Sequence, residues 1–380
     1  MDFALNADQK MTVETAQAML GEHSSSERVR LAMQTESGID AALWSLMAEE
    51  LGWCCLSVPE EFGGVGLGEL DLALLLEQLG YHLSCVPFFS TVVLAAKSLE
   101  YTAAAHAQTH YLPRIAAGQL RATLAWAPLC AKTAVEPTLR RTSAGLQLDG
   151  HIPYVLDGAS AELLLIPART EEGQLCLVAL PADAEGLKVR ALQTLDTTRR
   201  YADLELAQVR LSDEAVISAG DVAPALQKVT DLARILLAAE QLGGAQRCLD
   251  LTVAYTGERV QFGRSIASFQ AIKHRCAEMM GSIEATRSMV YGASIMAASL
   301  DDHSLAMEAA AVKSMASDAY FHCAQEAIQL HGGVGFTWEY DPHLYFKRAQ
   351  ASSAWLGSAD TLLAGIAAGL LDGEEVAHAS

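Results

Sequence analysis

The spacing of hydrophobic and polar residues divides the chain into three stretches of different character. Residues 1 to about 118 show the apolar spacing of helices, as in the leucines around Glu77, and the glycine-rich turn EEFGGVGLG interrupts them. From about Gln119 to Gly220, short apolar or alternating runs are separated by Gly, Pro and Asp, which predicts antiparallel strands. Helical spacing then returns in three long runs, Ala225–Glu258, Ser268–Leu300 and Leu305–Leu330.

This order of elements predicts an α+β protein that is mostly α-helical. We expect an N-terminal helical domain over residues 1–118, a middle antiparallel β-domain over 119–220 and a C-terminal four-helix bundle domain over 221–380. The N-terminus has no basic flank followed by an apolar run, and no uninterrupted apolar stretch approaches the ~20 residues that span a bilayer. We therefore expect neither a secretory signal nor membrane insertion.

Charge and cysteine usage exclude several classes of partner. Lys and Arg number 26 against 46 Asp and Glu, so the net charge is -20. A surface of this charge repels nucleic acid and anionic membranes, although local arginines and helix N-termini can still hold a small anionic ligand. The eight cysteines are scattered without a CxxC spacing. This pattern favours reduced thiols in a cytoplasmic protein over a disulfide framework or a metal site.

Three segments carry a resemblance to a known family. They are PEEFGGVGLGELDLALLLEQLG (Pro59–Gly80), GERVQFGRSIASFQAIKHRCAEM (Gly257–Met279) and QLHGGVGFTWEYDPHLYFKRA (Gln329–Ala349). In this order, over nearly the whole chain, they resemble the acyl-CoA dehydrogenase family of flavoproteins. The resemblance extends to subunits of the heterotetrameric bacterial enzymes of sterol side-chain degradation. It implies that family's fold, FAD as cofactor, and α,β-desaturation of an acyl-CoA thioester.

The last two segments contain residue types that suit the diphosphate of a dinucleotide. Arg259 offers a planar, permanently charged fork, and Phe262 can pack against an aromatic or ribityl group. Gly332 and Gly333 allow backbone amides to approach phosphate oxygens. Taken singly, Arg259 could instead cap a helix and the glycines could form a simple turn. By resemblance, the residues that touch FAD bound to a neighbouring subunit are Arg259, Gln261, Phe262, Gln270, Gln329, Gly332 and Gly333.

The family's catalytic base is missing from its usual place. Leu356 stands where the family carries the glutamate of a Tyr-Glu-Gly-Thr motif, and Ala233 occupies the position that a minority of members use. Arg234, next to it, is a substrate-binding residue by resemblance. Glu240 lies two helical turns further along, among leucines and alanines, and is a candidate base because such surroundings raise a carboxyl pKa. The alternative is a structural glutamate paired with Arg247 or with an arginine of a neighbouring helix.

The middle stretch also lacks the family's own flavin contacts. Residues 125–132 replace a glycine- and serine-containing loop, and Leu156 stands where a threonine bonds the flavin. The residues that are missing are those that a subunit of this family uses to bind its own flavin, whereas the residues that are kept contact the flavin of a neighbouring subunit. We call a subunit that supplies only the second set a lending subunit. This pattern predicts that the chain is the lending subunit of an α2β2 complex with a homologous subunit. The further partners that the resemblance implies are an acyl-CoA substrate and electron-transfer flavoprotein. The alternatives are a self-sufficient dehydrogenase using Glu240 and a flavin-free acyl-CoA-binding or scaffold protein.

Overall fold

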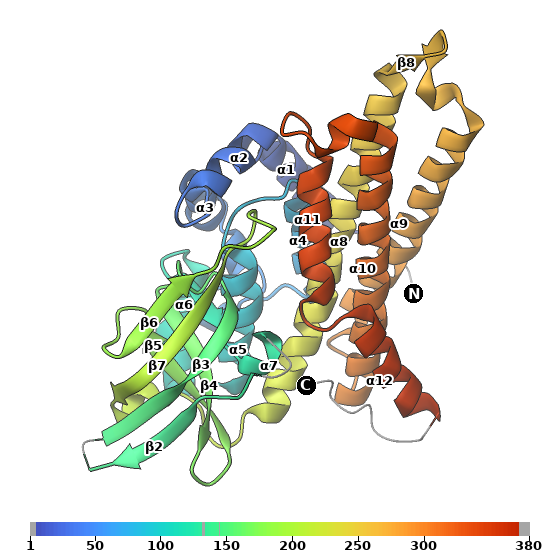
Figure 1. Ribbon diagram of the computed structural model, residues 1–380. Helices are drawn as coiled ribbons and strands as arrows, with labels where there is room; N and C mark the ends of the chain where they lie inside the picture. Colours follow the sequence, from blue (N-terminus) through green and yellow to red (C-terminus); the bar gives the residue numbers. More distant parts are fainter. Residues whose placement is uncertain (1–4, 131–133, 144, 372–380) are drawn as a thin grey trace. The chain divides into compact units, whose positions relative to one another are not determined.

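The computed structural model describes residues 5–130, 134–143 and 145–371 and confirms a mostly helical α+β fold (Figure 1). The chain forms two compact units, each built from separate stretches of sequence. Among the described residues, the helical unit comprises residues 5–31, 68–84 and 234–371, and the sheet unit comprises residues 32–67, 85–130, 134–143 and 145–233.

The longest helices lie in the second half of the chain. Within the helical unit, α9, α11 and α12 each pack against α10, and α4 packs against α1 and α9. The helices found mainly in this unit are α1 (Ala7–His23), α2 (Ser26–Gln34), α4 (Glu69–Tyr81), α8 (Ala223–Glu258), α9 (Gln270–Met296), α10 (Asp302–His331), α11 (Pro342–Ala354) and α12 (Ala359–Leu371).

Local sequence signals explain where several of these helices begin and how closely they pack. Asn6 accepts a hydrogen bond from the backbone N–H of Gln9, whose side chain bonds back to Asn6, so a capping box starts α1. Asp301 accepts from the Ser304 N–H at 2.8 Å and starts α10 in the same way. Where α4 crosses α8, a Cβ on Gly80 would overlap the backbone oxygen of Glu240, so the two helices meet at glycine.

The sheet unit holds a seven-stranded sheet in the order β1-β4-β2-β3-β7-β6, with β5 paired to β4. Most pairs are antiparallel, as the sequence predicts, but the short β1–β4 and β2–β4 pairs are parallel. The strands are β1 (Ala122–Leu124), β2 (Thr138–Thr142), β3 (Gly145–Leu156), β4 (Leu163–Thr170), β5 (Leu175–Pro181), β6 (Leu187–Ala191) and β7 (Tyr201–Leu211). The accompanying helices are α3 (Ala41–Ser45), α5 (Lys97–Thr102), α6 (Ala105–Ala116) and α7 (Ala127–Cys130).

Alternating side chains of the sheet make its core. Leu148, Ile152, Leu164, Val178 and Leu204 are fully buried together. Because successive side chains of a strand point to opposite faces, the apolar alternation read from the sequence produces one continuous buried face. Helices give way to strands between α6 and β1, and strands to helices between β7 and α8. The predicted domain limits at 118 and 220 fall in these connections, and they remain predictions.

One stretch in the described part of the chain, Pro342–Leu371, is long and apolar enough to cross a membrane by length and composition. A single stretch of this kind is weak evidence. It is not a continuous helix, because α11 and α12 are separated by a turn in which Leu356 has φ +59° and Gly357 has φ +105°. The stretch therefore gives no positive evidence for membrane insertion.

Candidate functional site

The segment Gly257–Met279 folds into a hairpin between two long helices. After α8, the strands β8 (Val260–Gln261) and β9 (Arg264–Ser265) pair antiparallel. The two residues between them, Phe262 and Gly263, have φ +54° and +76°, the signature of a tight two-residue hairpin turn. The Ile266 N–H donates to the Arg259 oxygen at 2.9 Å and closes the hairpin. The fold thus presents Arg259, Gln261 and Phe262 on one small projection.

The predicted cofactor-binding side chains of this hairpin point away from the helical core. Phe262 is 91% exposed, and Arg259 and Gln261 are also exposed. Among the described residues, the Gln261 side chain donates only to the Val260 oxygen, at 2.9 Å. Within the described residues, the Arg259 guanidinium has no hydrogen bond or ion pair. Only the backbone N–H of Arg259 bonds the end of α8, so its side chain does not serve as a helix cap.

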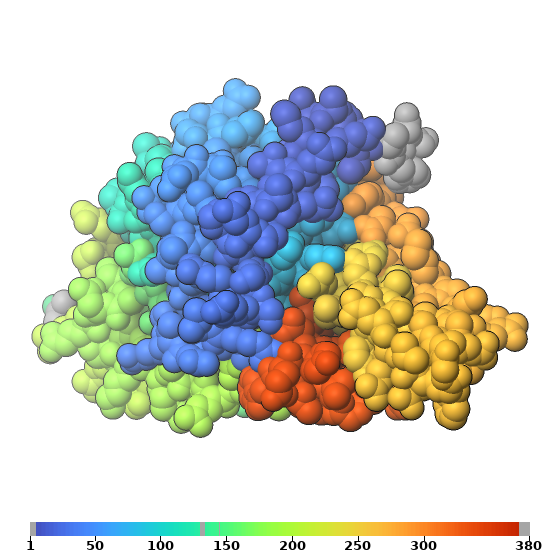
Figure 2. All heavy atoms as spheres, turned by 90° about the horizontal axis from the view of Figure 1, so that it is seen from above, coloured from blue at the N-terminus to red at the C-terminus, as the bar shows by residue number. Residues whose placement is uncertain are grey.

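The glycine pair lies beside the end of the same helix. Gly332 follows α10 with φ +65°, and a Cβ on Gly332 or Gly333 would meet nothing within 4 Å. His331 stacks on Tyr255 of α8, with ring centroids 4.3 Å apart, so the ends of α10 and α8 are held together. Figure 2 shows this region of the helical unit as the yellow hairpin surface next to the red-orange segment after α10.

These positions fit the diphosphate of FAD offered from outside the helical unit. An unengaged guanidinium, exposed amides and backbone glycines with open space above them are the donors that such a group needs. Gln329, on the last turn of α10, and Gln270, the first residue of α9, are exposed as well. The structure therefore brings the hairpin and the glycine pair together, while the contact with FAD remains a prediction.

The sheet unit has fewer side-chain groups that could bind a flavin than the family pattern requires. Leu156 is buried and carries no side-chain donor, and its carbonyl oxygen already accepts from the Thr123 hydroxyl at 2.8 Å. The next residue, Asp157, accepts a hydrogen bond from Ser90 at 2.7 Å. The replaced loop forms the short helix α7, and its last two residues, Ala131 and Lys132, lie outside the described part of the chain. At Leu156 the side chain does not fit the hydrogen bond that the resemblance requires.

Two cations hold the turn that contains Leu356. Arg234 Nε donates to the Leu356 oxygen at 2.9 Å. Lys313 Nζ, fully buried on α10, donates to the oxygens of Ser352, Ser353 and Gly357 at 3.2, 2.7 and 2.8 Å. Burial, helped by Arg234 and opposed by Asp318, lowers the pKa of Lys313 to about 7. The sequence did not single out Lys313, because one lysine in an alanine-rich helix carries no motif.

Glu240 is engaged by a buried partner. Arg348 of α11 donates to its Oε1 at 2.7 Å, and the two side chains are only 5% and 8% exposed. Arg247, the partner weighed from the sequence, instead donates to the Tyr81 hydroxyl at 3.2 Å. A proton taken from a substrate would neutralise Glu240 and break its ion pair with buried Arg348, which is costly. The geometry is that of a structural ion pair with a neighbouring helix, and the catalytic role of Glu240 remains a prediction.

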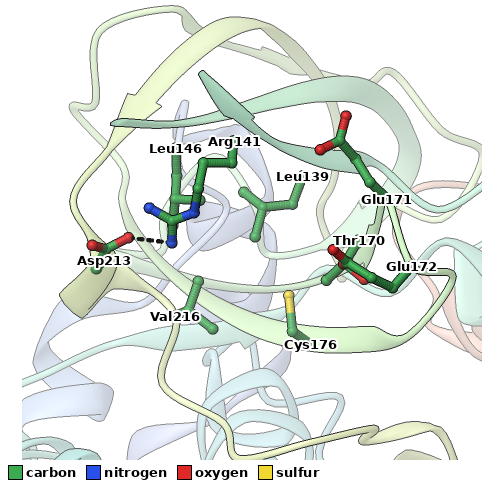
Figure 3. A pocket seen from close by; sticks show the side chains of 9 residues that line it. All are labelled: Leu139, Arg141, Leu146, Thr170, Glu171, Glu172, Cys176, Asp213 and Val216. Carbon is green, nitrogen blue, oxygen red and sulfur yellow. Dashed lines mark hydrogen bonds and ion pairs between the residues drawn. The ribbon is translucent and has the colours of Figure 1, made fainter. Parts of the chain in front are cut away.

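Two cavities lie within single units and contain none of the predicted site residues. The one in the sheet unit measures about 450 Å³ (Figure 3). Arg141 and Asp213 form an ion pair at 2.8 Å on its wall, and burial raises the pKa of the Cys176 thiol, which makes it a poor nucleophile. The cavity of about 580 Å³ in the helical unit is lined by polar side chains that include Glu77, His82 and Arg287. Among the described residues, no cluster of His, Cys, Asp or Glu could hold a metal ion.

Comparison with known proteins places the chain in a family. A model of the acyl-CoA dehydrogenase N-terminal domain matches residues 6–119, and a model of the C-terminal domain of the same family matches residues 223–371. The chain belongs to the acyl-CoA dehydrogenase family. The resemblance read from the three sequence segments is thereby confirmed, as is the fold that it implied.

Three similar proteins match this chain along almost their full length. Acyl-CoA dehydrogenase IpdE2 of Mycolicibacterium smegmatis is 34% identical over 361 residues, covering 93% of this chain and 96% of that protein. A chain of the ChsE4-ChsE5 complex from Mycobacterium tuberculosis has a TM-score of 0.89 and 26% identity, covering 97% of this chain and 99% of that one. A variant of the Tcur3481-Tcur3483 steroid ACAD has a TM-score of 0.85 and 30% identity, covering 96% and 98%.

Proposed function

We propose that this acyl-CoA dehydrogenase is the lending subunit of an α2β2 complex, completing the FAD site of a homologous subunit. The observation that carries the proposal is the contrast between two sets of residues. In the hairpin, Arg259, Gln261 and Phe262 are exposed, and the Arg259 guanidinium is not engaged by another described residue. Leu156, by contrast, cannot make the hydrogen bond to flavin, and Leu356 cannot act as a base. The ChsE4-ChsE5 complex supports a heteromeric assembly by analogy.

In the proposed complex the two chains divide the work of desaturation. Acyl-CoA dehydrogenases bind FAD, which supplies the acceptor for the hydride that leaves the substrate β-carbon. In this chain, Arg259 and the amides of Gly332 and Gly333 would hold the diphosphate, and Gln261, Gln270 and Gln329 would donate further hydrogen bonds. The carboxylate that removes the α-proton then belongs to the homologous subunit, because Ala233 and Leu356 occupy both familiar base positions.

The relatives support a proposal for the substrate class of the complex. The similarity to the Tcur3481-Tcur3483 steroid ACAD supports an acyl-CoA with a bulky, steroid-derived acyl group as substrate. Electron-transfer flavoprotein is the proposed acceptor of the electrons from FAD, and the cytoplasm is the proposed location. The ion pair of Glu240 with Arg348 disfavours the alternative of a self-sufficient enzyme that uses Glu240 as its base.

A visible absorption spectrum tests the proposal. We expect the chain purified alone to lack a flavin band and the complex with its homologous subunit to carry one FAD per two chains. Arg259→Ala should weaken the affinity of the complex for FAD more than tenfold, because a charge-assisted contact to phosphate is lost. Flavin occupancy after dialysis should fall accordingly. A stoichiometric flavin band in the chain alone would refute the proposal and favour a self-sufficient enzyme. A complex without flavin would favour a binding or scaffold protein.

A further inference from the structure

Arg264 lies in the hairpin beside the predicted FAD residues and was not among them. Its guanidinium carbon sits 4.1 Å from the centre of the Phe269 ring, within the range of a cation–π contact. Among the described residues no carboxylate pairs with Arg264, although the chain carries a net charge of -20. The ring is therefore the partner that fixes this arginine.

Phe269 in turn contacts two elements that present predicted FAD residues. Its ring meets the Phe262 ring edge-on, with centroids 6.0 Å apart. Its carbonyl oxygen accepts hydrogen bonds from the N–H groups of Ile272 and Lys273 at 3.1 and 3.2 Å, so Phe269 forms the start of α9 immediately before Gln270. The three side chains Arg264, Phe269 and Phe262 thus form one stack, which we call the hairpin stack.

We propose that Arg264 is a positioning residue for FAD: by stacking on Phe269 it holds Phe262 and Gln270 where the cofactor of the homologous subunit meets them. This inference rests on the proposed lending function. The hairpin tip has little else to fix it, because Phe262 is 91% exposed and the strands are only two residues long. A tip that is already ordered before FAD arrives loses less entropy on binding, and this raises affinity without a new contact.

The test measures how fast FAD leaves the assembled complex after dilution, followed by the fluorescence of released flavin. Arg264→Met keeps a long side chain but removes the charge, and we expect FAD loss to accelerate about two- to fivefold. Arg264→Lys keeps a cation over the ring and should lie closer to wild type than Arg264→Met. Phe269→Leu should accelerate loss to a similar extent, and the double variant should be no faster than either single one. Arg210→Met, at an exposed arginine of β7, serves as the matched control and should change nothing.

The outcomes separate this inference from direct contact and from the proposed function. Additive effects of Arg264→Met and Phe269→Leu would overturn it in favour of Arg264 touching FAD independently of the ring. An unchanged rate in Arg264→Met, or a rate in Arg264→Lys equal to that of Arg264→Met, would also overturn it. If Arg259→Ala speeds FAD loss while Arg264→Met does not, only this inference fails. If neither variant changes the rate, the lending function itself is contradicted.

Discussion

Glu240 shows how sequence neighbours and spatial neighbours can lead to different expectations for one residue. Its flanking leucines and alanines predict a carboxylate in an apolar environment, and that prediction is correct for the side chains adjacent in sequence. The decisive neighbour is Arg348, which follows 108 residues later on another helix. No spacing rule within α8 could indicate that contact, because it depends on how α8 and α11 pack.

We expect Glu240→Gln to lower stability and leave turnover of the complex nearly unchanged. Glutamine keeps the shape of the side chain but removes the negative charge that pairs with buried Arg348, which costs about 3 kcal/mol. Thermal unfolding and steady-state turnover, measured well below the melting temperature, check the two effects separately. The double variant Glu240→Gln/Arg348→Met should recover stability because no unpaired charge remains. Turnover lost by several orders of magnitude with flavin still bound would instead identify Glu240 as the base.

His82 gives the helical unit a dependence on pH. Burial, assisted by the nearby charge of Arg247, lowers the pKa of His82 to about 4. Glu77, Asp250 and Arg287 line the same cavity. Since the folded-state pKa lies below the unfolded value of about 6.5, the unfolded chain binds more protons between these pH values. Stability contributed by neutral His82 is therefore present above about pH 6.5 and lost as pH falls toward 4.

The expected loss is about 1–2 kcal/mol, reduced from the full linkage value because His82 is partly exposed to water. Denaturant unfolding of the isolated chain at pH 7 and pH 4.5 measures it. His82→Gln should flatten this part of the pH dependence, since glutamine does not titrate in the range. An identical pH dependence in wild type and His82→Gln would show that other groups are responsible.

At the scale of elements, the long helices could be predicted and the turns between them could not. The predicted run Ala225–Glu258 corresponds to α8, Ala223–Glu258, because apolar spacing over many turns fixes a helix well. The β8–β9 hairpin was missed, since two-residue strands have no alternation to detect. The two parallel pairs of the sheet were missed for a different reason: pairing between distant strands depends on the tertiary fold.

The turn after α11 depends on Lys313, and we expect Lys313→Met to loosen it. Three carbonyl oxygens at the end of α11 and in the turn would lose their shared donor. Each buried acceptor left without a partner costs about 1–3 kcal/mol, partly offset because the buried charge is also removed. Hydrogen exchange should speed up in residues 352–358, and the melting temperature should fall. Lys188→Met, at an exposed lysine of β6, is the matched control, and equal effects of both changes would contradict the role of Lys313.

At the scale of the whole molecule, the hydrophobic pattern of the sequence and the compact units of the structure divide the chain differently. The pattern predicts three consecutive domains, whereas the helical unit gathers three stretches that are far apart in sequence. Helical spacing cannot tell which helices pack together, so residues 1–118 look uniform although they contribute to both units. The resemblance supplied the predicted FAD residues, and the fold then showed how two distant segments come together, because His331 stacks on Tyr255. Arg264 and Lys313 act through neighbours rather than motifs and needed the structure.

The last helix, α12, exposes an apolar face to water in the isolated chain. Leu363, Leu370 and Leu371 are 47%, 71% and 83% exposed, and Leu362 is buried. Gly365 and Gly369, four residues apart, would let another helix approach closely. Exposed apolar surface of this kind is typical of an interface between subunits. We therefore predict that α12 lies at the interface with the homologous subunit.

Replacing both Leu370 and Leu371 by serine tests that assignment. In the isolated chain the change should alter the free energy of unfolding by less than about 0.5 kcal/mol per site, because both side chains are exposed there. In the complex the same leucines would be buried, and losing two of them should weaken assembly at least tenfold, since each buried leucine contributes about 1.5–3 kcal/mol. Light scattering after size exclusion, over a dilution series, measures the change in assembly. Leu195→Ser, at a 64% exposed leucine of the sheet unit, is the matched control and should leave assembly intact. A double variant that assembles as tightly as wild type would place the interface elsewhere on the bundle.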